Sequence, residues 1–131
     1  MPAKRIVAVA LCFAGSLLPP AVASTSAPPQ TAEPRTIEVI ARRYSFEPAV
    51  IEAVEGERLR ILVKSGDGLH GFEIKKFKVS KEIPRGGDPV VIEFTASEAG
   101  KFPILCSVFC GDGHGDMKGT LIVSAGDVAT P

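Results

Sequence analysis

The chain has 131 residues, and its 15 basic and 15 acidic side chains give a formal net charge of zero. This length suits a single domain rather than two. Because the charges are balanced and no strong basic cluster is present, nucleic-acid binding is not expected.

The first 23 residues have the features of a secretory signal peptide. Lys4 and Arg5 are followed by an apolar run over residues 6–18, and Ala21–Ala23 matches the small-residue pattern that precedes a cleavage site. The apolar run is too short for a permanent membrane span. We therefore expect cleavage after about Ala23 and a periplasmic location, with a retained N-terminal anchor as the alternative. Cleavage leaves 13 basic and 15 acidic residues, a formal charge of about −2.

The sequence after residue 23 predicts a linker followed by a β domain. Residues 24–35, STSAPPQTAEPR, have no apolar period and are expected to form a flexible linker. Residues 36–124 contain short runs of alternating apolar and polar residues, and residues 125–131 form a C-terminal tail. We expect strands over residues 36–42, 44–48, 50–54, 58–63, 70–74, 77–79, 90–94, 101–105 and 118–123. The pattern predicts an all-β fold, an antiparallel Greek-key sandwich or barrel.

Cysteine, histidine and methionine are concentrated in one part of the expected domain. Beyond the signal peptide these three residue types occur only at His70 and within residues 106–117, which read CSVFCGDGHGDM. Thiolate, imidazole and thioether groups together are typical ligands of copper. The cluster lies between the last two expected strands, and His70 begins another strand. Because loops of a Greek-key sandwich meet at one end, we expect His70 to reach the cluster.

The residues allow several kinds of site. A mononuclear copper centre would use His70, Cys110, His114 and Met117, and would leave Cys106 as a free thiol. Two copper ions bridged by both thiolates would use every donor, with one imidazole each and two weak ligands. Met117 would supply one weak ligand and the backbone carbonyl of Val108 the other. A disulfide or a zinc site remains an alternative, although neither accounts for the methionine.

The run CSVFCGDGHGDM resembles the C-x-x-x-C-x-x-x-H-x-x-M loop of dinuclear CuA centres. Such loops occur in subunit II of haem–copper cytochrome oxidases and in nitrous oxide reductase. Residues 67–72, DGLHGF, resemble the segment that supplies the upstream histidine in that family. The resemblance covers residues 36–124 and implies a cupredoxin fold. It also implies a mixed-valence pair of copper ions held by His70, Cys106, Cys110, His114, Met117 and the carbonyl of Val108.

Three features differ from oxidase subunit II. A signal peptide stands where the family has two transmembrane helices, Val108 stands where it has Glu, and the chain has no tryptophan. We therefore expect a soluble carrier of single electrons with no enzymatic activity. Its expected partner is a redox protein such as a cytochrome c or a terminal oxidase or reductase. The alternative function is copper binding and delivery to an oxidase under assembly.

Other side chains near the cluster are expected to have supporting roles. Phe72 and Phe109 are expected to pack beside the site and shield it from water. Asp67, Asp112 and Asp116 are expected to be solvated loop residues, or an acidic rim that attracts a basic cytochrome.

Overall fold

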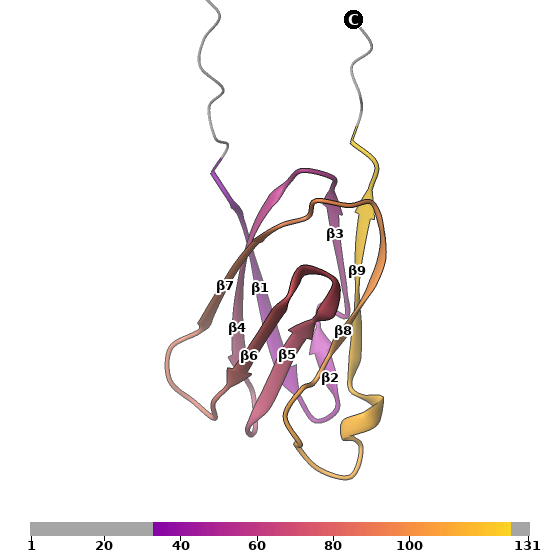
Figure 1. Ribbon diagram of the computed structural model, residues 1–131. Helices are drawn as coiled ribbons and strands as arrows, with labels where there is room; N and C mark the ends of the chain where they lie inside the picture. The colour runs from indigo at the N-terminus through magenta and orange to yellow at the C-terminus, as the bar shows by residue number, and fades with distance from the viewer. Residues whose placement is uncertain (1–32, 127–131) are drawn as a thin grey trace, which may run out of the picture. The chain divides into compact units, whose positions relative to one another are not determined.

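The computed structural model describes residues 33–126, so the expected signal peptide and most of the expected linker and tail lie outside the described residues. Nine strands and two single-turn 3₁₀ helices form the described part of the chain, which confirms the all-β prediction (Figure 1). The first strand begins at Arg35, inside the stretch assigned to the linker. The elements are β1 (Arg35–Arg42), β2 (Ser45–Glu47), β3 (Val50–Val54), β4 (Arg58–Ser65), β5 (His70–Ile74), η1 (Lys75–Phe77), β6 (Val79–Ile83), β7 (Val90–Thr95), β8 (Gly100–Leu105), η2 (His114–Asp116) and β9 (Lys118–Ser124).

The strands form two sheets, with the order β2-β1-β4-β7 in one and β3-β9-β8-β5-β6 in the other. The expectation of a wholly antiparallel sandwich is wrong for two strand pairs. β1 runs parallel to β4, with Arg35 opposite Leu59, and β3 runs parallel to β9, with Val50 opposite Thr120. The chain changes sheet after β2 and again after β3, so strands that are not consecutive become neighbours and run in the same direction.

The strand expected over residues 77–79 is also wrong. Lys75–Phe77 forms the 3₁₀ turn η1, and Lys78 has a left-handed backbone conformation with φ 54°. The chain needs these residues to reverse direction between β5 and β6, so the strand starts at Val79 and continues to Ile83. No helix of residues 33–126 is long and apolar enough to cross a membrane.

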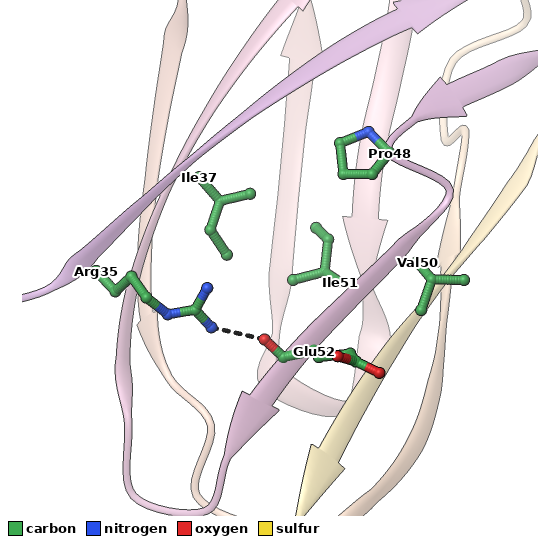
Figure 2. Close-up of a pocket in the computed structure, with 6 residues that line it drawn as sticks. All are labelled: Arg35, Ile37, Pro48, Val50, Ile51 and Glu52. Carbon is green, nitrogen blue, oxygen red and sulfur yellow. Dashed lines mark hydrogen bonds between the residues drawn. The ribbon is translucent and has the colours of Figure 1, made fainter.

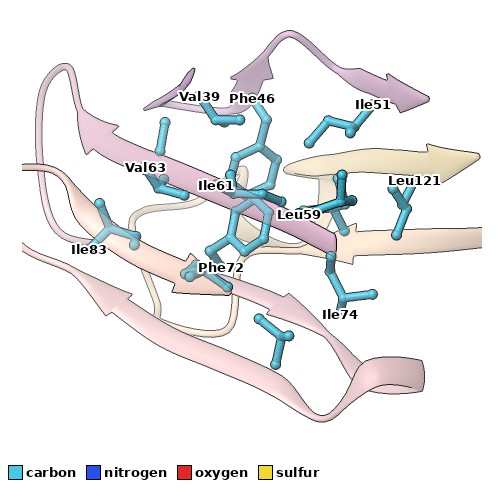
Figure 3. Packing of buried hydrophobic residues seen from close by; sticks show 14 of the residues in the cluster. Val39, Phe46, Ile51, Leu59, Ile61, Val63, Phe72, Ile74, Ile83 and Leu121 are labelled. Carbon is cyan, nitrogen blue, oxygen red and sulfur yellow. The ribbon is translucent and has the colours of Figure 1, made fainter. Parts of the chain in front are cut away.

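The core fills the space between the two sheets (Figure 3). Leu59, Ile61 and Val63 alternate along β4 and are fully buried, as a strand with one inward face requires. Phe46 and Phe72 meet edge to face, with ring centroids 5.6 Å apart. Phe72 is therefore buried as expected. Each large apolar side chain buried in this way contributes roughly 1.5–3 kcal/mol.

Three connections lie together at one end of the sandwich: the β1–β2 turn, the β4–β5 loop and the β8–β9 loop, residues 106–117 (Figure 1). β1 begins and β9 ends at the opposite end. This arrangement brings the start of β5 and the cysteine-containing loop together, as the sequence predicted.

Candidate metal centre

His70 and Cys106 occupy inward-facing positions at the ends of neighbouring strands. His70 opens β5 on the same face as Phe72, and its side chain is fully buried. Cys106 directly follows β8 and is 6% exposed. β5 and β8 are antiparallel with Glu73 opposite Leu105, so the next pair along the strands is Phe72 and Cys106. Strand alternation therefore directs the imidazole and the thiol to the same side.

Met117 extends the inward face of β9 in the same way. It directly precedes β9 and is 1% exposed. Leu105 pairs with Lys118, and the Cys106 backbone N–H then donates to the Met117 carbonyl at 3.4 Å. Cys106 and Met117 therefore close the β8–β9 hairpin as one further pair.

Cys110 and His114 are carried by the loop between that pair. The Cys110 sulfur lies 3.6 Å from the Cys106 sulfur, 3.8 Å from the Met117 sulfur and 3.9 Å from Nδ1 of His114. Both cysteines are free. Their separation is far beyond the roughly 2.05 Å of a disulfide bond.

The His70 ring has one satisfied and one unsatisfied nitrogen. Nε2 lies 2.6 Å from Oδ1 of Asp67, whereas the buried Nδ1 has no hydrogen-bond partner. Because a carboxylate accepts, Nε2 of the neutral ring carries the proton and Nδ1 keeps its lone pair. The donor atoms of His70, Cys106 and Cys110 lie within 4.8 Å of one another. A buried nitrogen without a partner is costly, and a metal ion would satisfy it, so these residues fit a metal.

The sequence predicted that Asp67 is a solvated loop residue or part of an acidic rim. In the structure its carboxylate instead contacts two other residues. Its Oδ2 accepts the backbone N–H of Arg43 at 2.8 Å, while Oδ1 contacts His70. The Arg43 N–H, and after it the contact with His70, hold the pKa of Asp67 below its usual value. The sequence signal was a carboxylate three residues before a histidine that opens a strand.

The thiol of Cys110 is protonated in the absence of metal. Burial raises its pKa to about 11, and the hydrogen bond with Cys106 acts in the same direction. The positive charge of Arg43 acts in the opposite direction. A metal that binds the thiolate must therefore displace a proton.

The Val108 carbonyl also faces the cluster. The Cys106 thiol donates to it at 3.1 Å, and Val108 is half-buried. The structure thus gathers the six predicted donors at one end of the sandwich, and their binding of copper stays a prediction. The donors are His70, Cys106, Val108, Cys110, His114 and Met117.

Gly71 lets the cysteine-containing loop pass close to β5. A Cβ at this position would lie 2.6 Å from the backbone nitrogens of both Ser107 and Val108. Real Cβ atoms do not approach backbone this closely, so a side chain here would displace the loop. The Gly71 N–H also donates to the Cys106 sulfur at 3.4 Å.

Phe109 does not shield the site in the way the sequence predicted. Its side chain is 72% exposed because the loop turns outward between the two cysteines. The ring centroid lies 5.7 Å from that of His114. Tyr44 covers the loop instead: a Cβ on Gly113 would lie 2.4 Å from the ring, and one on Gly111 would lie 2.5 Å from the hydroxyl oxygen. This role of Tyr44 was not predicted, because nothing in the local sequence of the β1–β2 turn indicates it.

A separate groove of about 400 Å³ lies between β1 and β3 (Figure 2). Its one cationic group, Arg35, donates to the Glu52 carbonyl and pairs with Glu57. The remaining lining side chains are mainly apolar, and none is a candidate metal ligand. The lining residues are Arg35, Ile37, Pro48, Val50, Ile51 and Glu52.

Relatives share both the sequence and the fold. Cytochrome c oxidase subunit 2 of Thermus thermophilus is 30% identical over 88 residues, which cover 67% of this chain and 64% of that protein. Subunit 2 of Synechocystis sp. is 30% identical over 60 residues, 46% of this chain and 18% of that protein. The chain thus spans less than two thirds of the length of these relatives.

Solved structures show the same architecture. The periplasmic domain of cytochrome oxidase subunit II from Bradyrhizobium japonicum superposes with a TM-score of 0.62 at 18% identity, covering 69% of this chain and 83% of that one. Auracyanin A, a "blue" copper protein from Chloroflexus aurantiacus, gives 0.54 at 18% identity, covering 70% and 99%. The family model for the cupredoxin-like domain matches residues 6–123. The chain therefore belongs to the cupredoxin-like family and is similar to the periplasmic domains of cytochrome c oxidase subunit II.

Proposed function

We propose that this chain is a copper protein that carries single electrons. The observation that carries the proposal is the buried, unpartnered Nδ1 of His70 beside two unbonded thiols. Imidazole, thiolate and thioether donors together favour copper over zinc, which does not use the thioether. The bound copper would supply a one-electron redox couple. The residues that would hold it are His70, Cys106, Cys110, His114, Met117 and the carbonyl of Val108.

The number of donors supports a dinuclear CuA-type centre over a mononuclear one. A mononuclear site uses one thiolate, two imidazoles and a weak axial ligand, and so leaves Cys106 without a role. Here Cys106 is as buried as Cys110, and their sulfurs lie 3.6 Å apart. The short distance between the two sulfurs supports a centre in which both thiolates would share the metal ions.

The protein part of the site suits electron transfer more than copper delivery. His70 is fully buried, Met117 is 1% exposed and each cysteine is 6% exposed. Water is thereby kept from these donors, and the strands that carry three of them limit rearrangement when an electron arrives. A site built to release copper would expose more of its ligands. The proposal assigns the chain no substrate chemistry of its own.

The relatives support the proposed location and partner. They include subunits of cytochrome c oxidase and the periplasmic domain of such a subunit. We place this chain in the periplasm after export, where it exchanges electrons with a redox protein such as a cytochrome c or a terminal oxidase or reductase. His114 is half-buried beside the exposed Phe109 and lies nearest to solvent among the imidazole donors.

Copper loading of the purified chain tests the metal centre. We expect two copper ions per chain, a purple colour, and a spin-resonance spectrum of one electron shared between two copper nuclei. The variant C106S should lose this spectrum. One copper per chain with a spectrum that C106S leaves intact would show a mononuclear centre instead.

Two rate measurements test the function of the loaded protein. We expect rapid electron exchange with a cytochrome c and slow transfer of copper to a metal-free acceptor domain. Slow electron exchange together with ready copper transfer would instead establish the delivery function.

A further inference from the structure

We infer that Arg43 is a positioning residue that ties the cysteine-containing loop to the histidine segment and sets a positive charge beside the metal site. The redox part of this inference rests on the proposed function. The positioning part concerns the metal-free protein as well, and it stands on the contacts of the described residues.

Arg43 contacts both ligand-bearing segments from a third place in the chain. Its Nε donates to the Cys110 carbonyl at 2.9 Å. Its backbone N–H donates to Oδ2 of Asp67 at 2.8 Å, and the other oxygen of that carboxylate lies 2.6 Å from His70 Nε2. A single residue of the β1–β2 turn therefore links Cys110 to the partner of His70.

The side chain crosses the gap between these segments. A Cβ on Gly68 would lie 3.2 Å from Nη2 of Arg43, so the guanidinium passes over the β4–β5 loop on its way to Cys110. Tyr44, the next residue, packs against Gly111 and Gly113. The β1–β2 turn thus holds the loop by a hydrogen bond at Cys110 and by an aromatic ring beyond it.

The hydrogen bond from Arg43 is needed because the tip of the loop makes few others. Within the described chain, the remaining hydrogen bonds of residues 107–116 stay inside the hairpin. His114 N–H donates to Gly111, and Asp116 N–H donates to Gly113, both at 3.0 Å. Those bonds shape the loop without fixing it to the sandwich. The bond from Arg43 spans 67 residues and does fix it.

The charge of Arg43 acts on the site independently of the hydrogen bond. A guanidinium stays protonated at all ordinary pH values. Arg43 is an exposed residue, but its Nε lies 2.9 Å from the carbonyl oxygen of Cys110, a candidate thiolate ligand, so its charge acts on the site at short range. A positive charge favours the oxidation state with more electrons, so Arg43 raises the reduction potential of the centre.

Three variants of the whole chain separate these effects. R43Q removes the charge, R43K keeps the charge without the planar donor, and R42Q is the matched control. Arg42 lies in β1 next to Arg43, packs over Gly66 and is 3.9 Å from Glu47. R42Q therefore removes the same charge from the neighbouring position, and within residues 33–126 Arg42 makes no hydrogen bond to the cysteine-containing loop.

Amide hydrogen exchange of the metal-free proteins tests the positioning role. Loss of one hydrogen bond to a charged group should speed exchange at His114 and Asp116 by about tenfold in R43Q and R43K. R42Q should exchange like the parent chain. Equal exchange in R43Q and R42Q would overturn the positioning role.

Reduction potentials of the copper-loaded proteins test the electrostatic role. We expect a lower potential in R43Q, with R43K and R42Q close to the parent chain. The difference between R43Q and R43K should become smaller in high salt, because Arg43 is exposed and dissolved ions screen its charge. Equal potentials in R43Q and R42Q would overturn this role. If the parent chain binds no copper, the proposed function fails, and the exchange measurement still decides the role of Arg43.

Discussion

The candidate ligands fall into two groups that differ in what positions them. His70, Cys106 and Met117 lie at the ends of β5, β8 and β9 and continue the inward face of each strand. Cys110 and His114 lie on the loop and depend on contacts with other segments. We call the first group the strand-borne ligands and the second the loop-borne ligands.

The difference shows how a β-sandwich can build a metal site. Folding of the core fixes the strand-borne ligands, because a shift of one residue would turn their side chains to the opposite face. The loop-borne ligands are held by the contacts of Arg43 and Tyr44 with the loop, and under the proposed function the bound metal would hold them as well. Changes at the two groups should therefore have different consequences for stability and for copper.

The largest effect on stability is expected from G71A. This variant tests whether the strand-borne ligands need the close contact between β5 and the β8–β9 loop. The added Cβ meets two backbone nitrogens at 2.6 Å, so we expect a loss of roughly 1–3 kcal/mol in unfolding free energy. Copper binding should fall with it. Urea unfolding and copper titration provide the measurements. G115A is the control, since no atom lies within 4 Å of its added Cβ. Similar behaviour of the two variants would contradict the prediction.

D67N should weaken copper binding without unfolding the protein. An amide has only one acceptor oxygen for the two N–H groups that contact Asp67, so it holds the His70 ring less firmly with the proton on Nε2. Loss of such a partner lowers metal affinity roughly 10–100-fold. Competition with a chelator measures the affinity. D112N changes an exposed carboxylate of the loop and serves as the control. An affinity equal to that of D112N would show that Asp67 does not orient the ring.

M117L and H114A compare one ligand from each group. Met117 is part of the core, so its replacement by a side chain of similar volume should cost less than about 1.5 kcal/mol in the metal-free protein. His114 is half-buried, and H114A should change metal-free stability by no more than about 0.5 kcal/mol. Both should alter the copper spectrum. A larger stability loss in H114A than in M117L would contradict the view that the strand-borne ligands, and not the loop-borne ligands, are fixed by folding of the core.

The smallest effect is expected at the opposite end of the sandwich, where pH should change stability without changing the site. The hydrogen bond from Arg35, and less strongly that from the Val54 N–H, lower the pKa of Glu57 in the folded state. Its stabilising contribution is complete above the unfolded pKa of about 4.3 and is lost as pH falls through the lower folded value.

For this half-exposed pair the contribution is roughly 0.2–1 kcal/mol. Thermal unfolding between about pH 3 and 6 should therefore show a smaller acid-induced loss in E57Q than in the parent chain. An unchanged pH profile would show that the pair contributes nothing. The copper spectrum of E57Q should match that of the parent chain at neutral pH.

The sequence was sufficient for features that depend on local alternation and spacing. The inward face of β4 and the approach of His70 to the loop both followed from such patterns. The turn at Lys75–Lys78 was missed because a short alternating run looks the same whether it forms a strand or reverses the chain. Parallel pairing was missed because it depends on where the chain changes sheets.

The supporting contacts of the site were harder to predict. The bond from Arg43 to Cys110 joins residues 67 positions apart, and no local pattern encodes it. Phe109 was expected to pack because it is apolar, yet the path of the loop leaves it exposed. The contact of Asp67 with His70 was not predicted either, although the spacing of the two residues contained a usable signal.

The pairing of Cys106 with Met117 makes the β8–β9 connection a hairpin whose stem and tip can be exchanged separately. The stem keeps one thiol and the thioether in place through the hydrogen bond between their backbones. Residues can then be added or removed at the tip, near Gly111–Gly113, without altering the register of the stem. A tip of different length would no longer present the Cys110 carbonyl to Arg43 or the loop glycines to Tyr44. The β1–β2 turn would therefore have to be redesigned to hold such a tip against the sandwich.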